Sequence, residues 1–136
     1  MATVAVHQEK ADEFWKLAQQ LYAERRDEFL CLNLAFYTLA HLIEAGLAIQ
    51  HKHPTSPPRG VPHADRGAKF RKYWVGNKWV EAEYADTYDE LNEIRHAYTF
   101  ADDGIPDRDF MEHFMAIAKP FIERLKEVLE SRPSPR

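Results

Sequence analysis

The chain has 136 residues, of which 45% are hydrophobic and 29% are charged. This length suits one ordinary domain with a real core, and the composition excludes a disordered chain. The net charge of −4 gives the protein no overall basic character, which argues against nucleic acid as a ligand of the surface as a whole.

The first half of the sequence predicts two helices and a loop. Residues 7–26 repeat apolar side chains at helical spacing, with charges on the other side. A second helix begins near Asp27 and continues to about Lys52. Residues 53–62 then hold four prolines and a glycine, a composition that ends a helix and predicts a loop.

The second half predicts a short helix and two long ones. The short helix covers about 65–74, and a long helix covers about 80–100. Asp107 or Asp109 is expected to cap the last helix, which continues to about Ser131, and Pro120 is expected to kink or divide it. We therefore expect one all-α domain over residues 1–131, a four- to five-helix up-and-down bundle with a long, Pro-rich, basic crossover loop. Residues 132–136 are expected to be a disordered tail.

Several features predict a cytoplasmic protein without membrane contact. The first ten residues lack the basic start and apolar stretch of a secretory signal. His41 and Glu44 interrupt the longest apolar run, which argues against a membrane span. The single cysteine, Cys31, has no disulfide partner within the chain and is expected to be a small buried residue in a reducing compartment.

Charge is strongly segregated along the sequence. Residues 51–78 contain seven Lys or Arg residues against one acid, and residues 81–93 then contain six acids and no base. A basic segment of this kind attracts phosphate, and an acidic neighbour can pair with it across a dimer. An ordinary solvated charged surface is the alternative interpretation.

The helix over residues 30–49 is apolar around most of its circumference, which predicts a central position in the bundle. Its polar side chains are spaced by four, four and three residues and fall on one stripe. The stripe consists of Asn33, Tyr37, His41 and Glu44. We expect it to face solvent, a dimer partner or a polar cleft between helices. His41 could also be a core histidine with satisfied hydrogen bonds.

Arg95 is the second anomaly of the sequence. It projects into the apolar stripe of the helix 80–100, between Leu91 and Tyr98, where the helical period calls for a hydrophobic residue. A buried arginine needs an acid, a carbonyl group or an anionic ligand, and Glu44 is the acid we expect it to meet. The alternative is an Arg95 that extends to the rim of the stripe.

These residues resemble the motifs of HEPN domains. The matching segments are Ala35-Phe-Tyr37-x-x-x-His41-x-x-Glu44-Ala45, Pro62-His63 and Leu91-x-x-x-Arg95-x-x-Tyr98, within roughly residues 28–125. The resemblance is nearest to nucleotidyltransferase-associated and substrate-binding helical domains. It implies a helical bundle, commonly a cytoplasmic homodimer, and a function as a toxin or defence ribonuclease or as a non-catalytic partner of a nucleotidyltransferase.

The ribonuclease motif of that family is incomplete here. Catalytic members carry Arg followed by His after four to six intervening residues, and Arg95 matches the arginine, but the positions expected for histidine are Phe100, Ala101 and Asp102. Metal-free RNA cleavage needs a group that accepts the 2′-hydroxyl proton and another that holds the phosphate. The resemblance therefore favours a non-catalytic module that binds a nucleotide or RNA or pairs with a nucleotidyltransferase, and it requires no cofactor.

The binding residues that follow from this interpretation come from two regions. The stripe, Arg95 and Tyr98 would form the pocket, and the basic segment would hold phosphate. The candidates are Tyr37, His41, Glu44, His63, Arg66, Arg95 and Tyr98, with Arg59 as a further phosphate contact.

Three other interpretations remain open. One is a toxin-type, metal-independent ribonuclease in which His41 or His63 replaces the missing histidine. Another is a purely structural dimer whose acidic and basic faces pair. The third is a metal-binding bundle, because Glu93-x-x-His96 has the spacing of di-iron proteins and His41-x-x-Glu44 reverses it. A di-iron site needs two such motifs, and we therefore expect no metal.

Overall fold

The computed structural model describes residues 4–50, 63–100 and 104–132, and for residues 63–65, 99 and 100 only the backbone. All secondary structure in these ranges is helical, which confirms the predicted all-α class. The Pro-rich segment 53–62 and the tail beyond residue 132 lie outside the described residues. The elements are α1 (Val4–Ala23), α2 (Glu28–Ile49), α3 (His63–Lys69), the π-helical turn η1 (Phe70–Val75), α4 (Glu83–Phe100) and α5 (Arg108–Glu130).

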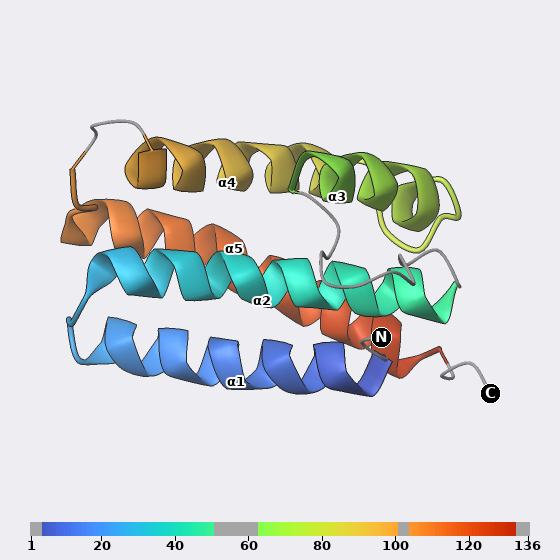
Figure 1. The fold of residues 1–136 in the computed structure, drawn as a ribbon, viewed down its shortest axis with the longest axis horizontal. Coiled ribbons are helices and arrows are strands. Elements are labelled where there is room, and N and C mark those ends of the chain that lie inside the picture. Colours follow the sequence, from blue (N-terminus) through green and yellow to red (C-terminus); the bar gives the residue numbers. More distant parts are fainter. Residues whose placement is uncertain (1–3, 51–62, 101–103, 133–136) are drawn as a thin grey trace.

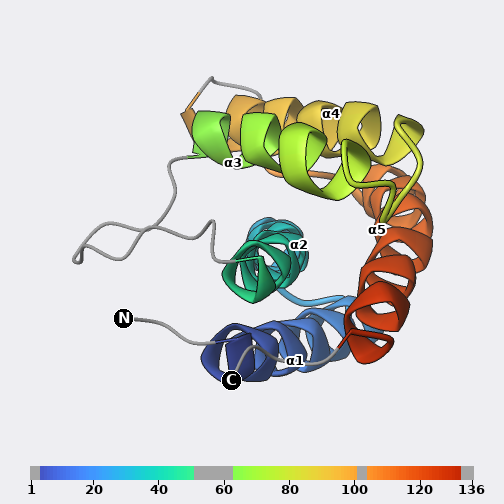
Figure 2. The same ribbon diagram turned by 90° about the vertical axis from the view of Figure 1, so that its right-hand side faces the viewer.

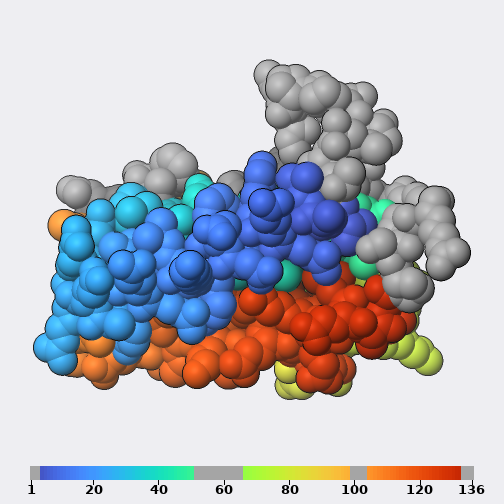
Figure 3. Space-filling view, turned by 90° about the horizontal axis from the view of Figure 1, so that it is seen from below, coloured from blue at the N-terminus to red at the C-terminus, as the bar shows by residue number. Residues whose placement is uncertain are grey.

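Helix α2 lies at the centre of the arrangement. It runs beside α1 and is flanked by α3 and α4 on the opposite side, while α5 closes a third side (Figures 1 and 2). From the side of α1, that helix and α5 lie next to each other and cover most of α2 (Figure 3). This central position agrees with the apolar circumference of the 30–49 segment, since Leu32, Phe36 and Leu39 are fully buried.

Local signals account for the helix ends. The Asp27 side chain accepts a hydrogen bond from the Leu30 N–H group, and Asp107 accepts one from Phe110, so each aspartate caps the helix that follows it. Of the two expected effects of Pro120, a kink or a division of the last helix, the division is wrong, because α5 is one helix from Arg108 to Glu130. Pro120 and Ala116 both lie on the exposed side of α5, so the carbonyl oxygen that loses its hydrogen bond to the proline can bind water.

Among the described residues, α2 is also the helix long and apolar enough to cross a membrane. This result is weak evidence for a membrane span, because 83% of the apolar window is buried inside the fold. A core helix that other helices surround has the same composition as a membrane span.

The contact between α2 and η1 depends on a glycine. The indole of Trp74 is fully buried, and its Nε1 donates a hydrogen bond of 3.2 Å to the carbonyl oxygen of Ile43. A Cβ atom added at Gly46 would overlap the six-membered ring of that indole. At Gly46, η1 therefore approaches α2 too closely for any side chain to fit between them.

Gly46→Ala tests this contact by the sign of its effect. In an open helix, alanine in place of glycine is stabilising by about 0.5–1 kcal/mol. Here we expect a decrease in the free energy of unfolding of about 1–3 kcal/mol, because the methyl group must displace the indole. Chemical denaturation measures the effect. In the Trp74→Phe background the same substitution should cost less, and an equal cost in both backgrounds would argue against the contact.

The predicted burial of Cys31 is confirmed, because the side chain is 1% exposed and packs between α2 and α1. Its Sγ donates to the carbonyl oxygen of Ala18 at 3.3 Å. Burial raises the pKa of the thiol from 9.0 to about 11. The nucleophilic thiolate is therefore scarce at pH 8 in the folded protein.

This burial predicts slow alkylation of Cys31. At pH 8 a thiol reagent should modify the native protein at least about tenfold more slowly than the urea-unfolded protein, because both access and thiolate fraction are reduced. The rate should still rise between pH 9 and 11, through the raised pKa. Equal rates for the native and unfolded protein at pH 8 would contradict the buried position.

Candidate functional site

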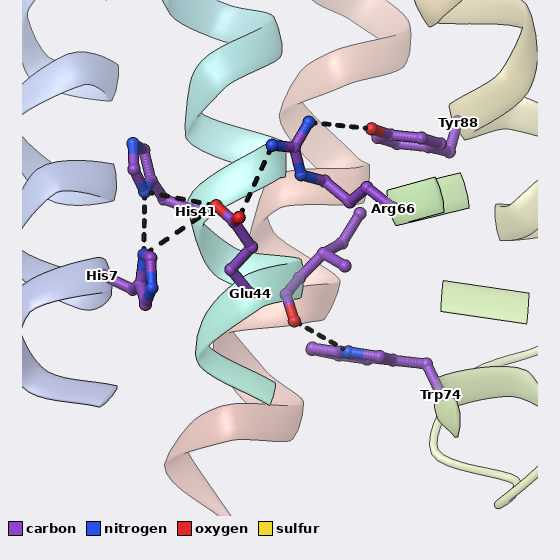
Figure 4. A network of polar contacts seen from close by, with 7 residues as sticks. His7, His41, Glu44, Arg66, Trp74 and Tyr88 are labelled. Carbon is purple, nitrogen blue, oxygen red and sulfur yellow. Dashed lines mark hydrogen bonds and ion pairs between the residues drawn. The ribbon is translucent and has the colours of Figure 1, made fainter. Parts of the chain in front are cut away.

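Four helices bring polar side chains together beside the C-terminal half of α2 (Figure 4). We call this group the polar cluster. His7 comes from α1, His41 and Glu44 come from α2, and Arg66 comes from α3, with the hydroxyl of Tyr88 from α4 behind it. The members of the polar cluster are His7, His41, Glu44, Arg66 and Tyr88.

Glu44 is the centre of the polar cluster and is only 3% exposed. Its two carboxylate oxygens face different partners. Oε2 lies 3.7 Å from Nδ1 of His41 and 3.9 Å from Nδ1 of His7, while Oε1 lies 3.5 Å from Nη2 of Arg66. A buried carboxylate is stable only with such partners, so the cluster compensates for the charge that the apolar helix carries.

The two imidazoles lie against each other. Their Nδ1 atoms are 3.0 Å apart, and their ring centroids are 5.2 Å apart. His7 is 4% exposed, whereas the side chain of His41 is 19% exposed and reaches the surface beside Phe14. Two positively charged imidazoles at this separation would repel each other, so the cluster favours at most one imidazolium.

Arg66 joins the acid to α4. Its Nη1 atom donates to the hydroxyl oxygen of Tyr88 at 3.4 Å, and the arginine is 6% exposed. Burial raises the pKa of the Tyr88 hydroxyl, although the Arg66 guanidinium opposes that rise. Tyr88 therefore stays neutral at physiological pH and acts as a hydrogen-bond partner of the arginine.

The arginine partner of Glu44 differs from the one expected from sequence. Arg95 is buried as predicted, at 3% exposure, but its guanidinium carbon lies 4.8 Å from the ring centroid of Phe36. Phe36 precedes Glu44 by eight residues, which is about 12 Å along a helix axis. The predicted pair of Glu44 with Arg95 is therefore wrong, and Arg66 takes its place.

The polar contacts of Arg95 are sparse. Its Nη2 donates to Oδ1 of Asn92 at a long 3.4 Å, and its guanidinium lies 5.9 Å from the ring centroid of Tyr37. Within the described residues, the buried Nε atom of Arg95 has no hydrogen-bond partner, and the arginine forms no ion pair with an acid. Arg95 is thus a buried cation held by aromatic faces.

The remaining candidates have partners other than the members of the polar cluster. Asn33 donates to the carbonyl oxygen of Phe29, so its amide is satisfied within α2. Tyr37 is half-buried between the rings of Phe14 and Phe36. The ring of Tyr98 lies 5.0 Å from that of Phe110 and packs toward α5 rather than the polar cluster.

Other sequence candidates fall at or beyond the limits of the described residues. His63 begins α3, but its side chain lies outside the described residues, as does all of Arg59. Glu93 and His96 are exposed on α4, away from the buried cluster. They therefore do not combine with His41 and Glu44 into a di-iron site.

Sequence reasoning missed His7. The signal was available, because His7 occupies the apolar stripe of α1 between Val4 and Ala11, both of which are buried. This is the kind of misplaced polar residue that identified Arg95. A histidine at one position of a stripe indicates a partner across the helix interface, and here the partners are His41 and Glu44.

The segregated charges meet at one point within the chain. Nη2 of Arg71 lies 3.1 Å from Oδ1 of Asp86 and 2.9 Å from Oδ2 of Asp89. The hydrogen bonds that Arg71 donates to the two aspartates raise its pKa. At this point the basic segment and the acidic helix pair inside one molecule.

No protein-family model matches the chain, and a comparison with curated proteins finds no similar sequence. The resemblance to HEPN domains accordingly depends on the motif residues themselves, among them His41, Glu44 and Arg95.

Proposed function

We propose that this chain is a HEPN-like helical binding module, non-catalytic, that receives a phosphate group of a nucleotide or of RNA at Arg95. The up-and-down bundle with its Pro-rich basic crossover, a cytoplasmic homodimer and a nucleotidyltransferase partner belong to the same proposal. They are what the motif resemblance implies for this chain.

The observation that carries the proposal is the state of Arg95. The guanidinium is 3% exposed, rests on Phe36 and has no acid partner among the described residues. Burying an uncompensated charge is unfavourable for stability, so a residue of this kind is typically kept for a ligand. A phosphate supplies two negative oxygens that fit the fork of a guanidinium.

The surroundings of Arg95 suit a nucleotide. Tyr37 and Asn92 are the half-buried side chains beside it, so a ligand would enter past them. The tyrosine ring offers a face on which a base can stack, and the asparagine amide offers a donor and an acceptor. A phosphate on Arg95 and a base on Tyr37 would use two of the side chains of the predicted pocket.

Arg95→Met tests the proposal by two opposite effects. The substitution removes the charge and keeps much of the apolar stem. We expect the affinity for AMP or a short RNA oligomer to fall at least about tenfold, because one charge-assisted hydrogen bond is lost. Thermal stability should be unchanged or higher, because an uncompensated buried charge disappears. Calorimetric titration and thermal unfolding measure the two effects.

Arg124→Met is the matched control, since Arg124 pairs with Glu127 on the surface of α5. It makes the same change in net charge and should leave the affinity unaltered. Equal affinities of the Arg95→Met variant and the unchanged protein would contradict the proposal. A marked loss of stability without loss of affinity would assign Arg95 to the core instead.

The histidine pair favours a second candidate, the metal-independent ribonuclease. The 3.0 Å contact between His7 and His41 supplies imidazoles that the family motif lacks in this chain, and one of them would accept the 2′-hydroxyl proton. RNA cleavage that persists in EDTA and disappears in both Arg95→Met and His41→Ala would support the enzyme. Absence of RNA cleavage by the unchanged protein would contradict the ribonuclease and favour the non-catalytic binding module.

A further inference from the structure

The polar cluster contains three ligand atoms directed at one point. Nδ1 of His7, Nδ1 of His41 and a carboxylate oxygen of Glu44 all lie within 4.8 Å of one another. His41 and Glu44 stand at i and i+3 on α2 and so share one face of that helix, and α1 brings His7 to the same face (Figure 4). Two imidazoles and a carboxylate are a ligand set that transition metals use in proteins.

We infer that His7, His41 and Glu44 form a binding site for a divalent transition-metal ion, with Zn²⁺ as the best match. The three atoms form a triangle with sides of 3.0, 3.7 and 3.9 Å. The circle through the corners of that triangle has a radius of about 2.1 Å, which is the length of zinc–nitrogen and zinc–oxygen bonds. An ion at its centre would therefore lie at bond length from all three atoms, in their plane, once the proton between the two imidazoles has been released.

The separations also bear on the coordination geometry. Ligand atoms at bond lengths of about 2.1 Å lie about 3.4 Å apart in a tetrahedron and about 3.0 Å apart at adjacent corners of an octahedron. Two of the three observed separations are longer than the tetrahedral value and one is shorter, so the side chains must move a little to form a distorted tetrahedron. Imidazole nitrogens also argue against Mg²⁺ and Ca²⁺, which take oxygen ligands. Zn²⁺ with a fourth, non-protein ligand is therefore the best match.

Arg66 orients the carboxylate for this role. It contacts Oε1 of Glu44, the oxygen on the far side from the histidines, and so leaves Oε2 directed at the two imidazoles. Tyr88 in turn holds Arg66. Residues that contact a metal ligand but not the metal fix the orientation of that ligand, and their loss typically weakens metal binding by about 10–100-fold. Arg66 is accordingly a positioning residue.

The burial of the site is graded. The side chains of His7 and Glu44 are each 5% exposed, whereas that of His41 is 19% exposed. An ion would enter on the His41 side, where the fourth ligand would also lie. Three protein ligands with one exchangeable position are the arrangement of catalytic rather than structural zinc sites. This inference is independent of nucleotide binding at Arg95, because the two groups share no residue.

The test is a titration of the full chain with Zn²⁺ after treatment with a chelator. Competition with a chromophoric chelator should give a stoichiometry of one ion per chain. The midpoint temperature of thermal unfolding should rise by about 10 °C when the concentration of free zinc exceeds the dissociation constant a hundredfold. His41→Ala removes the most exposed ligand and should weaken binding at least about a hundredfold, with Glu44→Gln weakening it about 10–100-fold. Failure of the unchanged chain to bind one ion would overturn the inference.

His113→Ala is the matched control, because His113 is an exposed histidine of α5 outside the cluster. It should not alter the affinity. A loss of affinity in His113→Ala that His41→Ala does not show would assign the binding to surface histidines and overturn the inference.

A spectroscopic measurement on the unchanged chain avoids dependence on variants that fail to fold. Co²⁺ in place of Zn²⁺ should give the intense visible absorption of four-coordinate cobalt. The weak absorption of six-coordinate cobalt would contradict the tetrahedral site. Nucleotide affinity measured with and without zinc in parallel separates failure of this site from failure of the Arg95 proposal.

Discussion

The carboxylate of Glu44 in the middle of the most apolar helix is the constraint on which the arrangement of this protein depends. A helix that is apolar on nearly every side must be surrounded by other helices, and that packing removes its one acid from water. Glu44 therefore needs polar partners from the surrounding elements. His7 on α1 and Arg66 on α3 supply them, so this one charge has partners on two of the helices that face α2.

The two arginines that approach α2 have different kinds of partner. Arg66 finds an acid and becomes part of a network that ends at Tyr88. Arg95, farther along the same helix, finds the face of an aromatic ring, which compensates a buried charge much less than a carboxylate does. Among the described residues, Glu44 thus has a cationic partner, whereas Arg95 has no acidic one. The two sites that we propose differ in the same way, since one would take a cation and the other an anion.

Periodicity in the sequence was enough to predict the long helices, the central place of α2 and the burial of Arg95. Turn composition left the cap of α5 open between Asp107 and Asp109, of which Asp107 is the cap. Periodicity also placed His41 and Glu44 on one stripe of α2. It did not predict the partner of Glu44, because two arginines, Arg66 and Arg95, could each meet a carboxylate and only the relative position of the helices decides between them. Pairing across helices depends on axial offset, which no local pattern encodes.

The continuity of α5 through Pro120 illustrates the same limit for a single helix. The sequence shows a residue that breaks the hydrogen-bond ladder, but it does not show that the affected carbonyl group faces water. His7 is a different case, since its place in the apolar stripe of α1 was readable from the sequence. The information was present there, and only the partners were unknown.

The contact between Glu44 and Arg66 also bears on the order in which the protein is made. Helices α1 and α2 leave the ribosome before α3, and together they already hold the carboxylate and both histidines. The arginine comes 22 residues after the acid, across the segment 51–62. Until α3 has been synthesised, the carboxylate lacks its guanidinium partner, and the apolar faces of α2 that the later helices cover remain open to water. The first half of the chain is therefore poorly suited to independent folding, and the native packing of α2 has to wait for α3 and α5.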